Sequence, residues 1–259
     1  MTVPARRCPG TQLQPRTPSA LRLLTVNCHK GFNWLNRRFI LPELREAVRT
    51  LSCDLVFLQE VLGEHQRLFP EGTWQPQYEF LADSMWPEYA YGRNAVYPEG
   101  HHGNALLSRF PIVDHYNLDV SVRGNEERGL LYARLDWPGH GPCHAICVHL
   151  GLRESHRQRQ AQLLCELLHT LPTSEPLIVA GDFNDWRMRL HPALTECGLT
   201  EAFVSTSGRP ARSFPARLPL LPLDRIYVRN LAVRAPQVLI RQPWSHLSDH
   251  APLVTEVLL

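Results

Sequence analysis

Several apolar stretches of this chain end on one polar residue, and this pattern restricts the possible folds. LRLLTVN, DLVFLQE, PCHAICVH and PLIVAGD read as buried β-strands, and they end on Asn27, Glu60, His149 and Asp182. In layered α/β proteins, ligands bind in a crevice at the carboxyl ends of the strands. We therefore expect these polar side chains to meet at one edge of a sheet.

The rest of the pattern predicts more strands than helices. Apolar residues recur at helical spacing over 43–51 and 155–171, with Ser155 as the expected N-cap of the second helix. Further strands are expected at 102–112, 128–137, 222–228, 234–240 and 251–259. Hairpins mixed with strand–helix–strand units indicate two packed sheets with helices outside. The segment 205–222, rich in Pro and Arg, shows no clear element.

The composition is that of a globular protein. Hydrophobic residues make up 44% of the chain and charged residues 20%, and the net charge of +2 does not by itself indicate nucleic acid. We expect a flexible leader over 1–20 without the apolar core of a secretory signal, followed by one domain over 21–259. No apolar run approaches the length of about 18 residues that a transmembrane helix needs.

The seven cysteines form no paired framework. Their number is odd, and Cys143 and Cys147 have no second Cys or His pair at zinc-finger spacing. Reduced, mostly packed thiols in a cytoplasmic protein are therefore expected. We expect a soluble monomer.

The stretch VAGDFNDW, residues 179–186, crowds Asp182, Asn184 and Asp185 together after a buried strand. A turn would account for them, because Asp, Asn and Gly all supply turn geometry. A loop that handles phosphate or metal is the alternative, and the stretch alone does not separate the two. If the chain stays extended there, Asp182 and Asn184 point to the same face. Asp185 is interpreted as a turn or cap residue.

The polar groups at predicted strand ends form a set with a consistent chemistry. Its members are Asn27, Glu60, His149, Asp182, Asn184, Asp224, Asp249 and His250. Carboxylates, amides and imidazoles without a thiol suit Mg²⁺ or Mn²⁺ rather than zinc. Mg²⁺ keeps several waters and takes a substrate phosphate as a further ligand, and the chain lacks a Walker motif. The set therefore indicates a metal-assisted phosphoryl hydrolase.

Seven sequence blocks strengthen this interpretation: TVNCH, LVFLQE, HGNALLSRFPI, CVHL, IVAGDFND, LDRIYV and SDHAPL. In order and spacing the chain resembles the endonuclease/exonuclease/phosphatase superfamily from about residue 21 to 259, and it is most similar to small stand-alone bacterial members. The resemblance implies a deoxyribonuclease I-like fold, a four-layer α/β sandwich of two packed mixed sheets flanked by helices. It also implies one or two Mg²⁺ ions at the rim, with Mn²⁺ as a possible substitute.

The resemblance implies a metal site formed by three residues. Glu60 would be the main Mg²⁺ ligand. Asn27 would support the metal or bind phosphate, and Asp249 would ligate or approach the metal.

The resemblance also implies catalytic roles. Asp182 would polarise the attacking water, and Asn184 would orient that water or a phosphate oxygen. His250 would act at the phosphate, with Asp224 fixing its tautomer. His149 would donate to a phosphoryl oxygen.

Other polar residues receive weaker interpretations. Asn104 and Arg128 could contact the substrate phosphate. Glu99 is the candidate for the carboxylate that orients His149. The remaining residues are read as solvated or local, and they are His29, His101, His102, Arg153, Arg157 and Arg159.

The sequence does not decide which phosphate ester is the substrate. A phosphodiester or a phosphomonoester would fit, carried either by nucleic acid or by a phospholipid or inositol phosphate. Arg209, Arg212, Arg217 and Phe214 could form a rim for nucleic acid or for peripheral membrane contact. The alternative from another class is a catalytically inactive binding module on the same fold, which would have lost a metal carboxylate or the Asp–His pair.

Overall fold

The computed structural model describes residues 20–32, 38–65, 75–82, 86–124 and 126–259. The expected leader lies outside the described residues, apart from Ala20. The division into a leader and one domain therefore stays a prediction.

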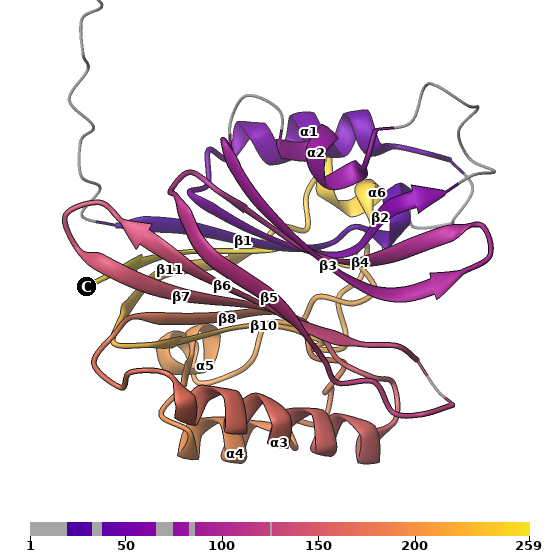
Figure 1. The fold of residues 1–259 in the computed structure, drawn as a ribbon. Coiled ribbons are helices and arrows are strands. Elements are labelled where there is room, and N and C mark those ends of the chain that lie inside the picture. Colours follow the sequence, from indigo (N-terminus) through magenta and orange to yellow (C-terminus); the bar gives the residue numbers. More distant parts are fainter. Residues whose placement is uncertain (1–19, 33–37, 66–74, 83–85, 125) are drawn as a thin grey trace, which may run out of the picture.

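Two six-stranded sheets pack face to face, and helices cover both outer faces (Figure 1). The first sheet has the order β11-β12-β1-β2-β4-β3, and the second has the order β5-β6-β7-β8-β10-β9. The strands of the first sheet are β1 (Leu21–Asn27), β2 (Leu55–His65), β3 (Glu88–Tyr97), β4 (Gly100–Ser108), β11 (Ala232–Val238) and β12 (Leu253–Leu258). Those of the second are β5 (Ile112–Asp119), β6 (Gly129–Trp137), β7 (Gly141–His149), β8 (Leu177–Asp182), β9 (Thr200–Glu201) and β10 (Asp224–Arg229).

The helices form the two outer layers (Figure 1). The first sheet carries α1 (Leu41–Thr50), α2 (Gln77–Ala82) and α6 (Trp244–Leu247), and a short 3₁₀ turn, η1 (His29–Gly31), follows β1. The second sheet carries α3 (Glu154–Thr170), α4 (His191–Glu196) and α5 (Ala202–Ser207). None of the helices in the described part of the chain is long and apolar enough to span a membrane.

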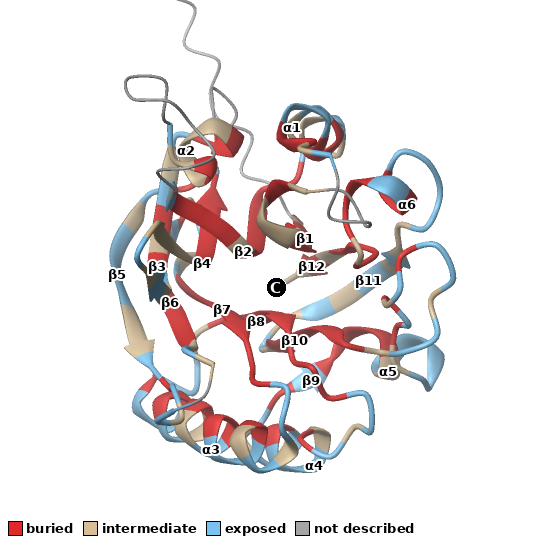
Figure 2. Ribbon diagram, turned by 90° about the vertical axis from the view of Figure 1, so that its right-hand side faces the viewer, coloured by how far each residue is buried: buried red, intermediate tan, exposed pale blue. Residues whose placement is uncertain are grey.

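The main core lies between the sheets, as the red strands of Figure 2 show. Leu23 and Phe57 from the first sheet join Ala133, Ala145 and Ile178 from the second in one buried cluster. Further apolar clusters lie under α1 and under α3. Strands buried on both faces need apolar residues at nearly every position, which explains the continuous apolar runs in the sequence.

Parallel pairing brings the polar strand ends level with one another. β1 runs parallel to β2 with Asn27 opposite Gln59, and β7 runs parallel to β8 with His149 opposite Asp182. The other pairs are antiparallel, so both sheets are mixed. The carboxyl ends of the parallel strands therefore define one rim.

Two details of the second predicted helix are wrong. α3 begins at Glu154 after Arg153, so Ser155 is not its N-cap. Arg157 is buried rather than solvated, because its guanidinium donates to the carbonyl oxygens of Gly151 and Leu152. A buried guanidinium needs such acceptors, and the loop after β7 supplies them. Arg153 and Arg159 are exposed, as expected.

The predicted pattern missed two long strands, β3 and β5, and one covalent bond. β3 was overlooked because its sequence, EYAYGRNAVY, places Gly, Arg and Asn inside the strand. Cys165 of α3 forms a disulfide with Cys197, which follows α4, so the expectation of reduced thiols is wrong for this pair. The cysteines at 28, 53, 143 and 147 are free and buried.

Candidate active site

Three neighbouring strands of the second sheet place polar residues side by side at the rim. His149 lies opposite Asp182 in the β7/β8 register, and Asp182 lies opposite Asp224 in the β8/β10 register. All three side chains are buried. The distance from His149 Nε2 to Asp182 Oδ2 is 3.5 Å. The carboxylate that contacts His149 is thus that of Asp182, whereas Glu99 lies in the turn between β3 and β4.

Close packing of these strands depends on the glycine of GDFN. Gly181 has a φ of +147°, and a Cβ there would lie 2.0 Å from the carbonyl oxygen of Val148. A side chain at this position would push β8 away from β7. The glycine therefore lets His149 and Asp182 meet.

His250 reaches the cluster from the loop after α6. Its Nδ1 lies 2.8 Å from Asp224 Oδ2, which is a hydrogen bond between two buried groups. Its Nε2 lies 3.8 Å from Asp182 Oδ2. The ring is also 5.0 Å from that of Phe214, measured between centroids. The imidazole is therefore oriented by Asp224 with its second nitrogen directed toward Asp182.

The first sheet completes the rim through Asn27 and Glu60. Asn27 Nδ2 lies 3.5 Å from Glu60 Oε1 and 3.3 Å from Asp182 Oδ2, so this amide links the two sheets. Its Oδ1 accepts a hydrogen bond from the backbone N–H of His29. Asn27 therefore presents its donor to the two carboxylates and positions them.

Glu60 does not end its strand as expected. β2 continues to His65, and its register with β4 shifts between Leu58 and Val61. Glu60 sits within this irregularity with a φ of +54°, a left-handed conformation that costs a non-glycine residue free energy. The bulge redirects the side chain, which is how a strand can present a functional group within its length.

The GDFND segment turns instead of staying extended. Asn184 has a φ of +51°, and its backbone N–H donates to Asp182 Oδ1 at 2.9 Å. Its Nδ2 donates to the carbonyl oxygen of Leu150. The two residues thus meet through a side-chain-capped turn, and the strand alternation expected from the sequence is wrong here. Asp185 accepts from the backbone N–H groups of Arg189 and Leu190, which confirms its role as a turn residue.

Asp249 lies at the more open side of the rim. Its Oδ1 is 3.8 Å from His29 Nδ1 and 3.2 Å from Ser248 Oγ. Ser248 was not among the expected residues, yet its hydroxyl donates to the Asn27 carbonyl at 2.6 Å and accepts from the His250 N–H. The serine of the SDH block therefore fastens the loop of His250 to β1. Only its position in that block could have indicated this role.

A family model described as "Endonuclease/Exonuclease/phosphatase family" matches residues 24–250.

The chain belongs to the endonuclease/exonuclease/phosphatase family.

It is 56% identical over 248 residues to YbhP of Escherichia coli (strain K12), itself an uncharacterised protein, and the match covers 93% of this chain and 97% of YbhP. A crystal structure of a family protein from Beutenbergia cavernae superposes with a TM-score of 0.76 at 20% identity, covering 93% of this chain and 72% of that chain. D. rerio TDP2 complexed with a single-strand DNA product gives a TM-score of 0.69 at 15% identity, covering 93% and 100%. These likenesses confirm the deoxyribonuclease I-like four-layer sandwich expected from the sequence.

Within this member of the family, the two rim histidines have opposite electrostatic environments. Burial lowers the pKa of His250, but the carboxylates of Asp224 and Asp182 outweigh burial and raise it to about 10. Burial also lowers the pKa of His149, and nearby Arg128 and His250 lower it further, so it lies well below its ordinary value. His250 is therefore an imidazolium at neutral pH, whereas His149 is neutral.

Asp182 lies between these two rings. Burial is the largest of the causes that raise its pKa to about 7, and the charge of Asp224 adds to it while His250 opposes it. A carboxyl group with such a pKa exchanges a proton with water near neutral pH.

The two expected substrate contacts lie in different surroundings. Asn104 is fully buried, and its Nδ2 donates to the carbonyl oxygens of Gly129 and Cys147 across the two sheets. Arg128 is half-buried, and its Nε donates to the carbonyl oxygen of Leu150. Burial lowers the pKa of Arg128, while the charges of the rim carboxylates oppose this shift. Arg128 is therefore at the rim, and the substrate roles of both residues stay predictions.

The structure places Lys30, His102 and Arg225 near the rim or its supporting turn, and sequence reasoning gave none of them such a place. Burial, together with the positive charges of Lys30 and Arg128, lowers the pKa of His102 to about 4. His102 is thus half-buried among cations, not solvated, and its place two residues before Asn104 in the HGN block was the available signal. Arg225 is fully buried and holds the turn after β8 by donating to the Asp185 carbonyl.

The oxygen atoms of the rim suit a hard divalent cation. Asp182, Asp224 and His250 each offer one ligand atom within 4.8 Å of the others, but Asp224 and His250 already bond to each other. Glu60 shares the Asn27 amide with Asp182, so two carboxylates converge there. Burial is the main cause that raises the pKa of Asp182, but the negative charges of Asp224 and Glu60 also contribute, and a divalent cation would offset these like charges. The donor set therefore fits a hard divalent cation.

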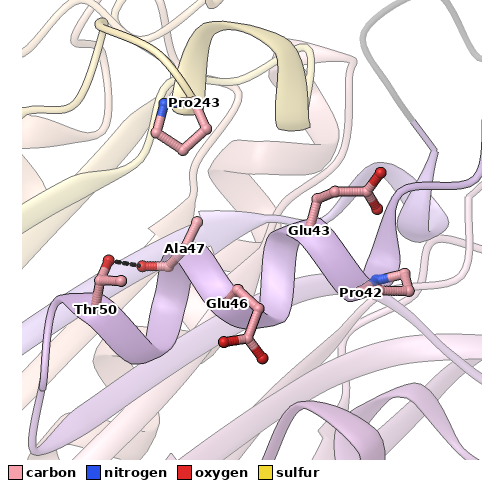
Figure 3. A pocket seen from close by; sticks show the side chains of 6 residues that line it. All are labelled: Pro42, Glu43, Glu46, Ala47, Thr50 and Pro243. Carbon is pink, nitrogen blue, oxygen red and sulfur yellow. Dashed lines mark hydrogen bonds between the residues drawn. The ribbon is translucent and has the colours of Figure 1, made fainter.

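Another groove, between α1 and Pro243, lacks this chemistry (Figure 3). Its volume is about 510 Å³, and its charged lining residues are Glu43 and Glu46. The described residues that line it include no histidine, lysine or arginine that could bind a phosphate.

Proposed function

We propose that the protein is a Mg²⁺-dependent hydrolase that cleaves a phosphodiester bond by attack of an activated water on phosphorus, with Mn²⁺ as a possible substitute. The observation that carries this proposal is the buried Asp182, which lies between a neutral His149 and a protonated His250. Asp182 can accept a proton from the attacking water, while the protonated His250 can stabilise negative charge on the phosphate.

Each of the rim residues then has its own role in the reaction. Asp182 accepts the proton of the attacking water, because its pKa is raised to about 7. Asn184 has its Nδ2 engaged by Leu150, so its Oδ1 is the atom that orients the water or a phosphate oxygen. His250, held by Asp224, donates to a phosphoryl oxygen, and His149 contacts a second oxygen.

The cation would be held by Glu60 and Asp249, with Asn27 positioning Glu60 from β1. When bound, it supplies Lewis-acid polarisation of a phosphate oxygen. Arg128 adds positive charge on the side of the cluster that faces His102 and Lys30. The cationic side would bind the phosphate, and the carboxylate side would bind the metal.

The alternative, an inactive module that binds phosphate or nucleic acid, predicts a damaged site. Here Glu60, Asp182, Asp224, Asp249 and His250 are all retained, and the Asp224–His250 pair has a hydrogen bond of 2.8 Å. A retained and oriented acid–base set favours catalysis over binding alone.

The test is hydrolysis of bis(p-nitrophenyl) phosphate and p-nitrophenyl phosphate, with Mg²⁺, with Mn²⁺ and with a chelator. We expect metal-dependent release of p-nitrophenol, faster from the diester. Faster release from the monoester would replace the diester proposal with a phosphomonoesterase. Binding of phosphate esters without turnover in any metal would support the inactive module.

A further inference from the structure

A groove beside the rim is both apolar and cationic. It has a volume of about 830 Å³ and lies between the loop 209–222 and the end of β11. Trp186, Leu220 and Ile240 line it and are 45%, 54% and 50% exposed. Its charged lining residues are Arg209 and Arg212. Large exposed side chains gathered at one place mark an interaction surface.

The charge of this region has one sign. The segment 202–223 contains three arginines and no Asp or Glu. Next to it, the guanidinium of Arg187 lies 4.3 Å from the centroid of the Trp186 ring. A partner that complements the groove must therefore offer apolar surface and negative charge together.

Hydrogen bonds connect one wall of the groove to the candidate active site. The backbone N–H of Ala216 donates to the carbonyl oxygen of Asp249, and that of Ala251 donates to the carbonyl oxygen of Ser213, each at 2.7 Å. Ser213 Oγ accepts from the backbone N–H of Asp224. The loop that forms one wall of the groove is thus bonded on both sides of His250. A surface held in the groove would lie beside the catalytic rim.

The chemistry of the exposed side chains favours lipid over nucleic acid. Binding of single-stranded nucleic acid relies on aromatic faces that stack on bases. Among the groove's lining residues, the exposed large side chains are mostly aliphatic, namely Leu220, Leu221 and Ile240. The exposed aromatic one is Trp186, and Arg187 covers a face of its ring. Aliphatic side chains inserted among acyl chains, with arginines at the headgroups, describe an interfacial membrane contact.

We propose that this groove and its arginines dock on the surface of an anionic phospholipid membrane, and that the substrate is a phosphodiester of a phospholipid headgroup. The second part rests on the proposed function. Water adds its oxygen to phosphorus, one P–O ester bond breaks, and the water proton passes by way of Asp182 to the departing alkoxide. The products are a phosphomonoester and an alcohol.

The docking is tested by co-sedimentation with vesicles of phosphatidylcholine alone and of phosphatidylcholine mixed with phosphatidylglycerol. Wild type should bind the anionic vesicles at least tenfold more tightly, and added salt should weaken the binding. Leu220→Ser with Ile240→Ser should lower this affinity on the order of tenfold or more, because two apolar anchors are lost. The matched control is Val113→Ser with Leu259→Ser, which alters two exposed apolar residues outside the groove and should bind like wild type.

Turnover of bis(p-nitrophenyl) phosphate is measured on the same proteins and should be unchanged in both double variants. Equal binding of wild type to both vesicle types, or full binding by the groove variant, would overturn the docking. Loss of binding to a single-stranded oligonucleotide in the groove variant, without loss of vesicle binding, would also overturn it and assign the groove to nucleic acid. Absence of turnover in wild type would instead overturn the proposed function and the substrate assignment, while the vesicle results still decide the docking.

Discussion

Two pairs of a buried imidazole and a carboxylate lie at opposite ends of the second sheet. At the rim, His250 Nδ1 lies 2.8 Å from Asp224 Oδ2. Near the start of β7, His144 Nε2 lies 2.6 Å from Glu175 Oε2. By distance and burial of the imidazole the two pairs are alike.

Their second ring nitrogens differ. His144 Nδ1 lies 2.9 Å from the Tyr132 hydroxyl, so both of its nitrogens are engaged by fixed protein groups. His250 Nε2 faces Asp182 at 3.8 Å, which is too long for a hydrogen bond. A carboxylate–imidazole pair becomes a candidate for catalysis only where one nitrogen is left for another partner. The pair near the start of β7 is therefore structural, and it provides a control for the rim.

The largest expected effect is loss of the metal. Glu60→Gln keeps the shape but removes the charge that holds Mg²⁺, so turnover of a diester should fall by orders of magnitude. Mg²⁺ should raise the melting temperature of wild type and of Glu175→Gln, and it should do so much less for Glu60→Gln, because binding to the folded state stabilises it. Turnover that survives both this substitution and a chelator would contradict the metal site.

Asp182→Asn should lower kcat and kcat/KM about equally, by a factor on the order of 10² or more, because the proton acceptor is lost. Steady-state kinetics on a soluble diester measure this effect. Asn184→Ala should act in the same direction less severely.

In chelator, Asp182→Asn should become more stable relative to wild type as the pH rises. The pKa of Asp182 is raised from 3.8 to about 7 in the folded protein, mainly by burial, so folded wild type binds this proton more tightly than the unfolded chain. Wild type therefore loses stability between pH 4 and 7, and the amide does not. Thermal midpoints across this range test the sign. A destabilised variant with normal turnover would reduce GDFND to a turn.

Matched substitutions of the carboxylates in the two pairs should affect kcat very differently. Asp224→Asn should lower kcat about 10- to 100-fold, as for partners that orient a histidine. Glu175→Gln should leave kcat near the wild-type value and lower only the melting temperature.

Within the rim pair, combining Asp224→Asn with His250→Ala should cost little more than His250→Ala alone, because members of one unit are non-additive. Strictly additive losses, or an equal kinetic effect of Glu175→Gln, would remove the distinction between the two ends of the sheet.

The smallest effect is expected just outside the cluster. Asp185 accepts two backbone N–H groups, so Asp185→Ala should lower the stability by about 0.5–2 kcal/mol, as for loss of a cap. Its kcat should change little, because it contacts the backbone of its own turn. Chemical denaturation gives the stability, and a kinetic loss as large as that of Asp182→Asn would extend the site to Asp185.

Many of the strands, and the polar residues at their ends, could be predicted from the local sequence. Strands packed between two layers need apolar side chains on both faces, so their continuous apolar runs are visible without a structure. The polar residue at the end of each run marks where the packing stops, which is why Asn27, His149 and Asp182 could be placed at one rim. Asp185 could be assigned to a turn because its hydrogen bonds go to residues four and five positions ahead.

The tertiary structure decided what depends on residues distant in the sequence. The bulge at Glu60 follows from register with β4, and the missed β3 is held by pairing with the same strand. The disulfide joins cysteines 32 positions apart, and Asn27 meets Asp182 across 155 positions. The sequence by itself determined which side chains could do chemistry. Only the tertiary structure decided which of these side chains would keep a nitrogen or oxygen atom free of hydrogen bonds. The other polar atoms are hydrogen-bonded to groups from other strands.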